Sequence, residues 1–343
     1  MQSGRIAIIG CGGRTALGFD RVSTAAAVRA GIPALAEHPY MIDRFGNPMR
    51  VARDLGLDPL LAGARRLVDL ALPAAHEALR PIQGQQGLSP VRLLVCTGEP
   101  RPGQSENFAT VLVEALREAL GPRIGTVAHL ARGHAGGLLA LALGAQAIRE
   151  GRTQLALVGG VDSYLHPETL EWLDDLEQLH SEQNLYGFCP GEAAGFVLLA
   201  SSDLARSAGI RPLLDLAGVG YGRETNLIKT KGICLGEGLS DAFRMAAPPE
   251  SPKVDRILCD MNGERYRGNE YGFAAIRNPT LFRNAADFET PADCWGDIGA
   301  ASGPLFVCLA AEAEARNYAK GPQTLVWASS EQGLRAAALL RRM

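Results

Sequence analysis

The sequence places a histidine where a chain of this kind could best activate a nucleophile. His134 lies in the glycine-rich turn 132–137, between a short apolar run and a long Leu- and Ala-rich segment that ends at Gly151. The apolar run predicts a strand, and the Leu/Ala segment predicts a helix that is buried on nearly all faces. Nucleophiles are activated at the positive end of such helices. We therefore take His134 as the first candidate for chemistry.

The elements that must position this turn recur along the chain in the same order twice. Each series reads as strand, helix, strand, helix entered through a Gly/Ala-rich turn, strand, strand, and the turn at 133–137 corresponds to a second turn at 296–303. We predict an α/β protein with two similar βαβαββ halves, residues 1–205 and 206–343. Packing through the two turn-borne helices would give an α/β/α/β/α layered body. Residues 31–57 read as a loop, and 270–277 as a short helix.

Composition excludes several classes of function. The formal net charge is −3 over 343 residues, which gives no sign of a nucleic-acid partner. No apolar run is long enough to predict a membrane span. The seven cysteines lack CxxC spacing, so we expect reduced thiols, a cytoplasmic protein and no metal. The glycines at 10–18 do not have the spacing of a dinucleotide site, and we predict no cofactor.

Five segments, taken in order, resemble the thiolase superfamily, and most closely the β-ketoacyl-acyl-carrier-protein synthases. These segments are IAIIGCGGRTALG (6–18), GHAGGLLALALGAQAIREGRTQLALVGGVDS (133–163), LYGFCPGEAAGFVLLASS (185–202), VDRILCD (254–260) and GDIGAASGPL (296–305). The resemblance implies a thiolase-like fold. It also implies a homodimer that pairs through the strand before the nucleophile turn, residues 124–130.

The residues on which the chemistry of this family depends are replaced together. The family has a cysteine at the helix N-terminus, which accepts an acyl group, and this chain has His134. The first catalytic histidine of the family matches Asp260, or Asn262 if the following glycine is matched instead. The second catalytic position matches Asp297. A supporting lysine and the late Gly-Phe-Gly-Gly loop also lack equivalents, so we expect a degenerate site.

Three other interpretations of these residues stay open. His134 with Asp260 and Asp297 could perform acid–base work, because a carboxylate orients an imidazole and raises its pKa. The same three residues form a known kind of metal-ligand set, although we assign no metal. A cysteine from elsewhere could replace the missing nucleophile; the candidates are Cys189, Cys259 and Cys294.

Several neighbouring residues are candidates for substrate binding. Arg265 and Arg267 could bind the phosphate of a phosphopantetheine arm or the acidic face of a partner, although their segment also suits an ordinary solvated loop. Arg132 could pair with Glu192 or face the pocket. The full set of predicted substrate-binding residues is Arg132, Gly136, Glu192, Arg265, Arg267 and Gly299.

The function that follows from this resemblance is a ketosynthase-like protein without condensing activity. It would bind an acyl chain, acyl-coenzyme A or an acyl-carrier protein, or act as a scaffold or adaptor for another protein. The alternative is an active acyltransferase or thioester hydrolase that uses His134 with Asp260 and Asp297. A third interpretation is an interaction protein whose pocket has closed. The sequence leaves open whether the chain is an enzyme, and an open or filled pocket at His134 is what distinguishes these functions.

Overall fold

The fold is a large mixed sheet covered and divided by helices. The computed structural model describes residues 4–230 and 232–343. The first half contains β1 (Ile6–Thr15), α1 (Arg21–Arg29), β2 (Leu35–Ile42), β3 (Pro48–Ala52), α2 (Gly63–Leu79), β4 (Val91–Thr97), α3 (Phe108–Leu120), β5 (Ile124–Ala131), α4 (Gly136–Arg149), β6 (Leu155–Ser163), α5 (Pro167–Asp175), β7 (Glu192–Ser201) and α6 (Ser202–Ser207). The second contains β8 (Leu214–Arg223), α7 (Glu237–Ala246), β9 (Arg256–Cys259), α8 (Arg265–Arg277), β10 (Phe288–Glu289), α9 (Ala292–Trp295), α10 (Ser302–Ala315), β11 (Gln323–Ser329) and β12 (Leu334–Arg341).

The strand order shows the internal duplication directly. The sheet runs β10-β9-β11-β12-β8-β1-β7-β6-β4-β5. Within each half the strands therefore have the same order, third-second-fourth-fifth-first, and corresponding neighbours pair in the same sense. A short antiparallel pairing of β1 with β8, at Ala7 and Ile8, joins the two halves. The predicted fold class is confirmed, with one strand–helix pair more in each half than expected. The boundary at 205/206 falls inside α6 and stays a prediction.

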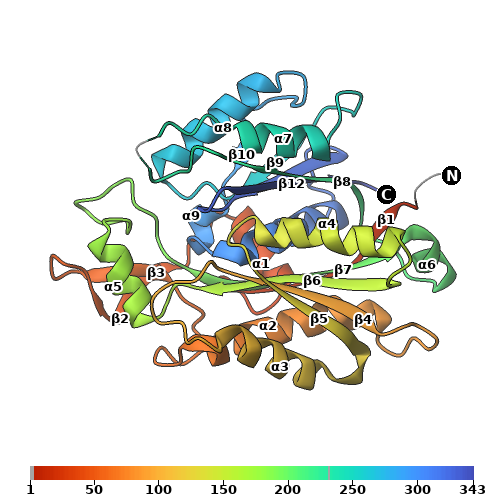
Figure 1. The fold of residues 1–343 in the computed structure, drawn as a ribbon, viewed down its shortest axis with the longest axis horizontal. Helices are drawn as coiled ribbons and strands as arrows, with labels where there is room; N and C mark the ends of the chain where they lie inside the picture. Colours follow the sequence, from red (N-terminus) through yellow and green to blue (C-terminus); the bar gives the residue numbers. More distant parts are fainter. Residues whose placement is uncertain (1–3, 231) are drawn as a thin grey trace.

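Three apolar cores separate five layers (Figure 1). The central core lies between the two halves of the sheet and is filled from α4 and α10, whose apolar residues face both ways. The second core lies between the first half of the sheet and the helices α2 and α3. The third lies under α7 and α8, which cover the other half. The expected α/β/α/β/α arrangement is thus what the chain adopts.

Two segments differ from the expectation. Residues 31–57 are not a loop: β2 and β3 form an antiparallel hairpin, whose turn is held by Asp43 Oδ1 accepting the N–H groups of Phe45 and Asn47. The hairpin packs Met49 and Val51 against the segment that carries α5, which gives it a small core of its own. The helix expected at 270–277 begins earlier, at Arg265. Its charged first turn resembles a solvated loop in sequence, but one of its two arginines, Arg267, is buried and pairs with Asp260 inside the protein.

In the part of the chain that the structure describes, no helix combines the length and the apolar character needed to cross a bilayer.

Candidate functional site

His134 lies directly before the N-terminus of α4, at the meeting point of the two halves. The turn that carries it follows β5, and Gly133 has a φ of 63°, which favours glycine. The start of α4 packs closely on the segment before α10. A Cβ at Gly137 would overlap the ring of Pro304, and a Cβ at Gly160 would overlap the carbonyl oxygen of Ala300. Glycines at these positions let α4 and β6 approach the segment 300–304 closely, which brings the side chains of the two turns together.

The imidazole of His134 is held by Asp297, which comes from the second turn. Nε2 of His134 lies 2.8 and 3.0 Å from the two carboxylate oxygens of Asp297, and both residues are buried. Because a carboxylate only accepts hydrogen bonds, Nε2 carries the proton. Asp297 also accepts the backbone N–H of Gly299 at 2.8 Å and Nδ2 of Asn262 at 2.6 Å. Two alternative matches to the first catalytic position, Asp260 and Asn262, thus lie in one cluster.

A second buried ion pair supports the first. Arg267 Nη1 donates to Asp260 Oδ2 at 2.8 Å, and the same oxygen accepts the backbone N–H of Ser329. Arg267 is fully buried and also lies 3.4 Å from Glu264. Its Nη2 is 3.4 Å from His134 Nε2, but both atoms carry hydrogens, so this contact is not a hydrogen bond. The cluster therefore contains two carboxylate–cation pairs in contact with each other.

Electrostatics in the cluster favours the charged forms of His134 and Asp297. Burial is the largest single effect and lowers the pKa of His134, but the charge of Asp297, its hydrogen bond and the charge of Asp260 together outweigh burial, and the net pKa is raised. Burial alone would raise the pKa of Asp297, yet the nearby His134 imidazolium and the hydrogen bond from it hold the pKa of that carboxyl well below its usual range. For Asp260, burial is the larger effect, and its pKa is raised despite Arg267. Asp260 therefore holds a proton more readily than Asp297 does.

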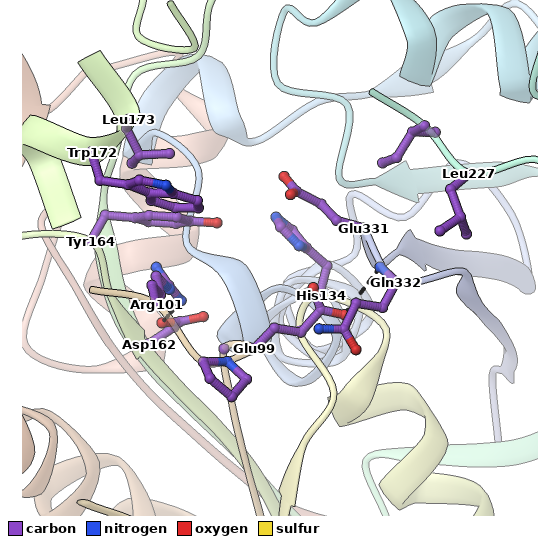
Figure 2. A pocket seen from close by; sticks show the side chains of 14 residues that line it. Glu99, Arg101, His134, Asp162, Tyr164, Trp172, Leu173, Leu227, Glu331 and Gln332 are labelled. Carbon is purple, nitrogen blue, oxygen red and sulfur yellow. Dashed lines mark hydrogen bonds and ion pairs between the residues drawn. The ribbon is translucent and has the colours of Figure 1, made fainter. Parts of the chain in front are cut away.

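A cavity opens on His134. Its volume is about 330 Å³. Nδ1 of His134 has no hydrogen-bond partner among residues 4–230 and 232–343, while Nε2 is turned to Asp297. In Figure 2, Arg101, Tyr164 and Trp172 lie on one side of the cavity, and His134 and Glu331 lie together on the opposite side. The lining residues are Gly98, Glu99, Pro100, Arg101, Gly133, His134, Asp162, Tyr164, Trp172, Leu173, Leu227, Ile228, Glu331 and Gln332.

No cysteine belongs to that lining within the described residues. Cys259 points its Sγ at the backbone oxygen of Glu289, and burial raises the pKa of Cys294 and Cys189. A high thiol pKa disfavours the thiolate that a nucleophile needs. The structure therefore does not support the interpretation, left open by the sequence, that one of these three cysteines replaces the nucleophile in the cavity.

The predicted substrate-binding residues are not brought together. Arg132 is exposed and does not contact Glu192, which is fully buried and accepts from Arg66 Nη2 at 2.7 Å. Arg265 is exposed and its guanidinium stacks on Tyr186, 3.3 Å from the ring centre. Arg267 is internal to the cluster and is not available to an external phosphate.

The two predicted glycines lie in the turns that bear the site. Gly136 begins α4, and a Cβ there would lie 3.1 Å from Cβ of Arg132. Gly299 gives its N–H to Asp297, has a φ of 50°, and a Cβ there would overlap the carboxylate of Asp162. Close packing therefore explains why glycine stands at both positions, and contact of these glycines with a substrate stays a prediction.

The cavity wall also contains a buried Arg–Asp pair that was not predicted from the sequence. Arg101 pairs with Asp162, and its guanidinium lies 4.0 Å from the centre of the Tyr164 ring. Asp162 also accepts the backbone N–H of Ala300 at 3.0 Å, so it links β6 to the second turn. Asp162 ends the strand after the nucleophile helix, and α/β sites form at the carboxyl ends of such strands. That position was a usable signal for Asp162, whereas Arg101 lies in a loop without a motif.

Comparison with known proteins agrees with this geometry. Residues 125–205, which carry β5, the His134 turn, α4, β6 and β7, match the family model described as "Beta-ketoacyl synthase, N-terminal domain". Over these residues the chain resembles the β-ketoacyl synthases. No curated protein matches the sequence.

Solved structures of ketosynthases share the fold over the full length. The chain superimposes with a TM-score of 0.79 and 16% identity on a structure described as "AntDE:AntF (apo): type II PKS acyl-carrier protein in complex with its ketosynthase bound to the hexaketide", with 100% of both chains covered. "The ishigamide ketosynthase/chain length factor" gives a TM-score of 0.72 and 20% identity, covering 99% of this chain and 100% of that one. A "Beta-ketoacyl synthase from Burkholderia phymatum STM815" gives 0.75 and 16%, covering 99% and 100%.

Proposed function

We propose that this ketosynthase-like chain binds acyl thioesters without condensing them. The observation that carries the proposal is the state of the nucleophile position: His134 stands there, its Nε2 is engaged by Asp297, and the cavity beside it holds no thiol among its described lining residues. Condensation by this family requires an acyl group held on a cysteine. A cavity of about 330 Å³ that opens on His134 still has room for a ligand.

The proposed ligands are thioesters of an acyl-carrier protein or of coenzyme A. The support is the likeness of the fold to a ketosynthase described in complex with its acyl-carrier protein and to a ketosynthase/chain length factor pair. The second of these structures, by its description, combines a ketosynthase with a chain length factor. We propose that this protein is a subunit that shapes or holds the acyl chain while a partner protein performs the chemistry.

The proposed partner surface is the edge strand β5. It is the last strand of the sheet, and its residues after Ile124 are half-buried or exposed. An edge strand with free backbone groups can pair with a second edge. A second copy of this chain would give the expected homodimer, and an active ketosynthase would give a heterodimer.

Incubation with acyl-coenzyme A and acyl-carrier thioesters tests the proposal. Intact mass and release of free thiol are followed for the wild type and His134→Ala. We expect no covalent adduct and no thiol release in either protein, together with saturable binding of the thioester to the wild type. Adduct formation or turnover that disappears in His134→Ala contradicts a non-condensing, purely binding role, and absence of binding contradicts the ligand class.

One observation favours a second function, thioester hydrolysis or acyl transfer by His134. Its Nδ1 opens on the cavity while Asp297 orients the ring through Nε2, which is the arrangement of a general base with its carboxylate partner. Because the pKa of His134 is raised, the base form increases as the pH rises through that value. A hydrolysis rate that increases with pH and vanishes in both His134→Ala and Asp297→Asn would support this function over binding alone.

A further inference from the structure

Three buried side chains outside the His134 cavity converge from separate elements. Glu224 follows β8, Cys234 precedes α7, and Glu270 belongs to α8. One ligand atom from each lies within 4.8 Å of the other two. Their exposed fractions are 1%, 8% and 0%, and none of them lines the cavity.

Each carboxylate of this cluster uses only one of its oxygens. Glu224 Oε2 accepts the backbone N–H of Gly238 at the start of α7, at 3.0 Å, and Glu270 Oε1 is engaged by Arg335 and lies 3.5 Å from Cys234 Sγ. Glu224 Oε1 and Glu270 Oε2 are buried without a partner among the described residues. Nη2 of Arg335 is also buried without a partner there, but Arg335 already engages Glu270 through Nε. A buried acceptor left unpaired costs about 1–3 kcal/mol, so the two carboxylate oxygens indicate a missing partner.

We infer that Glu224, Cys234 and Glu270 bind a divalent transition-metal ion of the zinc type. Sulfur with carboxylate oxygen suits Zn²⁺ or Co²⁺, and a thiol excludes Mg²⁺ and Ca²⁺ as preferred ions. Two carboxylates and a thiolate carry three negative charges, and Arg335 compensates one of them. A divalent cation neutralises the two that remain.

Binding would proceed with loss of the Cys234 proton to solvent and formation of a metal–sulfur bond. Burial, with the neighbouring Glu270, raises the pKa of the Cys234 thiol to about 11, so the metal must displace this proton. A water molecule would complete a tetrahedral set.

The position of the cluster gives metal binding a consequence for the cavity. Cys234 belongs to the connection between β8 and α7, and the same connection supplies Leu227 and Ile228 to the cavity wall. Its Lys229 lies 3.2 Å from Glu264 Oε1, next to the buried arginine of the main cluster. A metal would fix this connection to β8 at Glu224 and to α8 at Glu270, and so hold one wall of the cavity.

Titration of the metal-free protein with CoCl₂ alone tests the inference. We expect one Co²⁺ per chain, with thiolate-to-cobalt charge-transfer absorption that ZnCl₂ abolishes. Cys234→Ser should lose the charge-transfer absorption. Glu224→Gln keeps an acceptor for Gly238, and it should weaken Co²⁺ binding by more than about tenfold, the smallest loss typical even of outer-shell changes.

Cys189→Ser is the matched control, because this half-buried thiol lies outside the cluster and should bind Co²⁺ as the wild type does. Circular dichroism verifies that each variant is folded. Absence of Co²⁺ binding to the folded wild type, or absorption that persists in folded Cys234→Ser, overturns the inference. The inference is also overturned if Glu224→Gln unfolds at a higher temperature than the wild type and neither protein binds metal. That result would mean that Glu224 and Glu270 share a proton in the wild type.

Discussion

Replacing Asp297 by asparagine should destabilise the protein strongly, because this carboxylate holds the centre of the site together. It accepts from His134 at 2.8 and 3.0 Å, from Asn262 at 2.6 Å and from Gly299 at 2.8 Å. Asparagine keeps the shape and removes the charge. It has one acceptor oxygen, and its NH₂ group would face donors that the second carboxylate oxygen now satisfies.

The magnitude follows from two contributions. Breaking a buried ion pair by removing one partner costs about 3–5 kcal/mol. A buried donor left facing another donor costs about 1–3 kcal/mol, and part of this cost is already included in the value for the broken ion pair. We therefore expect Asp297→Asn to lower the free energy of unfolding by about 3–5 kcal/mol, a large fraction of the roughly 5–15 kcal/mol typical of a folded protein.

Urea denaturation at pH 6, followed by circular dichroism and by tryptophan fluorescence, measures this loss. Asp203→Asn is the matched control. Its carboxylate is 83% exposed and lies 3.5 Å from Arg206, so the same chemical change should cost less than about 1 kcal/mol. If Asp297→Asn unfolds within about 0.5 kcal/mol of the wild type, the carboxylate does not hold the cluster and the reasoning fails.

Three further outcomes follow from the same structure. The pKa of His134 is raised above 6.5 and that of Asp297 is lowered below 3.8, so their pair should stabilise the fold most fully between pH 3.8 and 6.5. This stability is lost as the pH rises through the folded pKa of His134 or falls through that of Asp297, and a urea midpoint that depends on pH as strongly in Asp297→Asn as in the wild type would contradict this. Gly160→Ala should destabilise by about 1–3 kcal/mol because its Cβ meets the Ala300 carbonyl, whereas Gly268→Ala, with open space in α8, should stabilise by about 0.5–1 kcal/mol; equal melting temperatures would refute this packing argument. Glu192→Gln should cost about 3–5 kcal/mol because it leaves the buried charge of Arg66 without a carboxylate, and a loss under about 1 kcal/mol in urea would contradict a structural role for this pair.

The sequence predicted the fold well because the fold depends on apolar periodicity and on glycines. The buried strands β1, β4, β6 and β7 are each built on a run of mostly apolar residues, and the central helices are apolar on nearly all sides. The hairpin β2–β3 was not predicted because only part of each strand is buried, so its pattern of exposed and buried residues is irregular.

The candidate site could be predicted only for the groups that lie in motifs. His134, Asp260, Asn262 and Asp297 lie in segments that resemble a family, and the structure brings all four together. Their roles stay predictions. The charges of the segment after β9 misled the interpretation, because alternation of charged residues does not reveal whether a side chain turns inward, as Arg267 does, or outward, as Arg265 does.

The contact of His134 with buried acids has a consequence for which residues this position can accept. His134→Cys would leave Asp297 buried without its imidazole, and the new thiol would lie near two carboxylates whose charge disfavours a thiolate. Such a single step would lose the ion pair and gain no nucleophile. A cysteine nucleophile at this position would need coordinated replacements in both halves of the chain, because His134 comes from one half and Asp297 from the other. The two halves are therefore constrained to change together at this point.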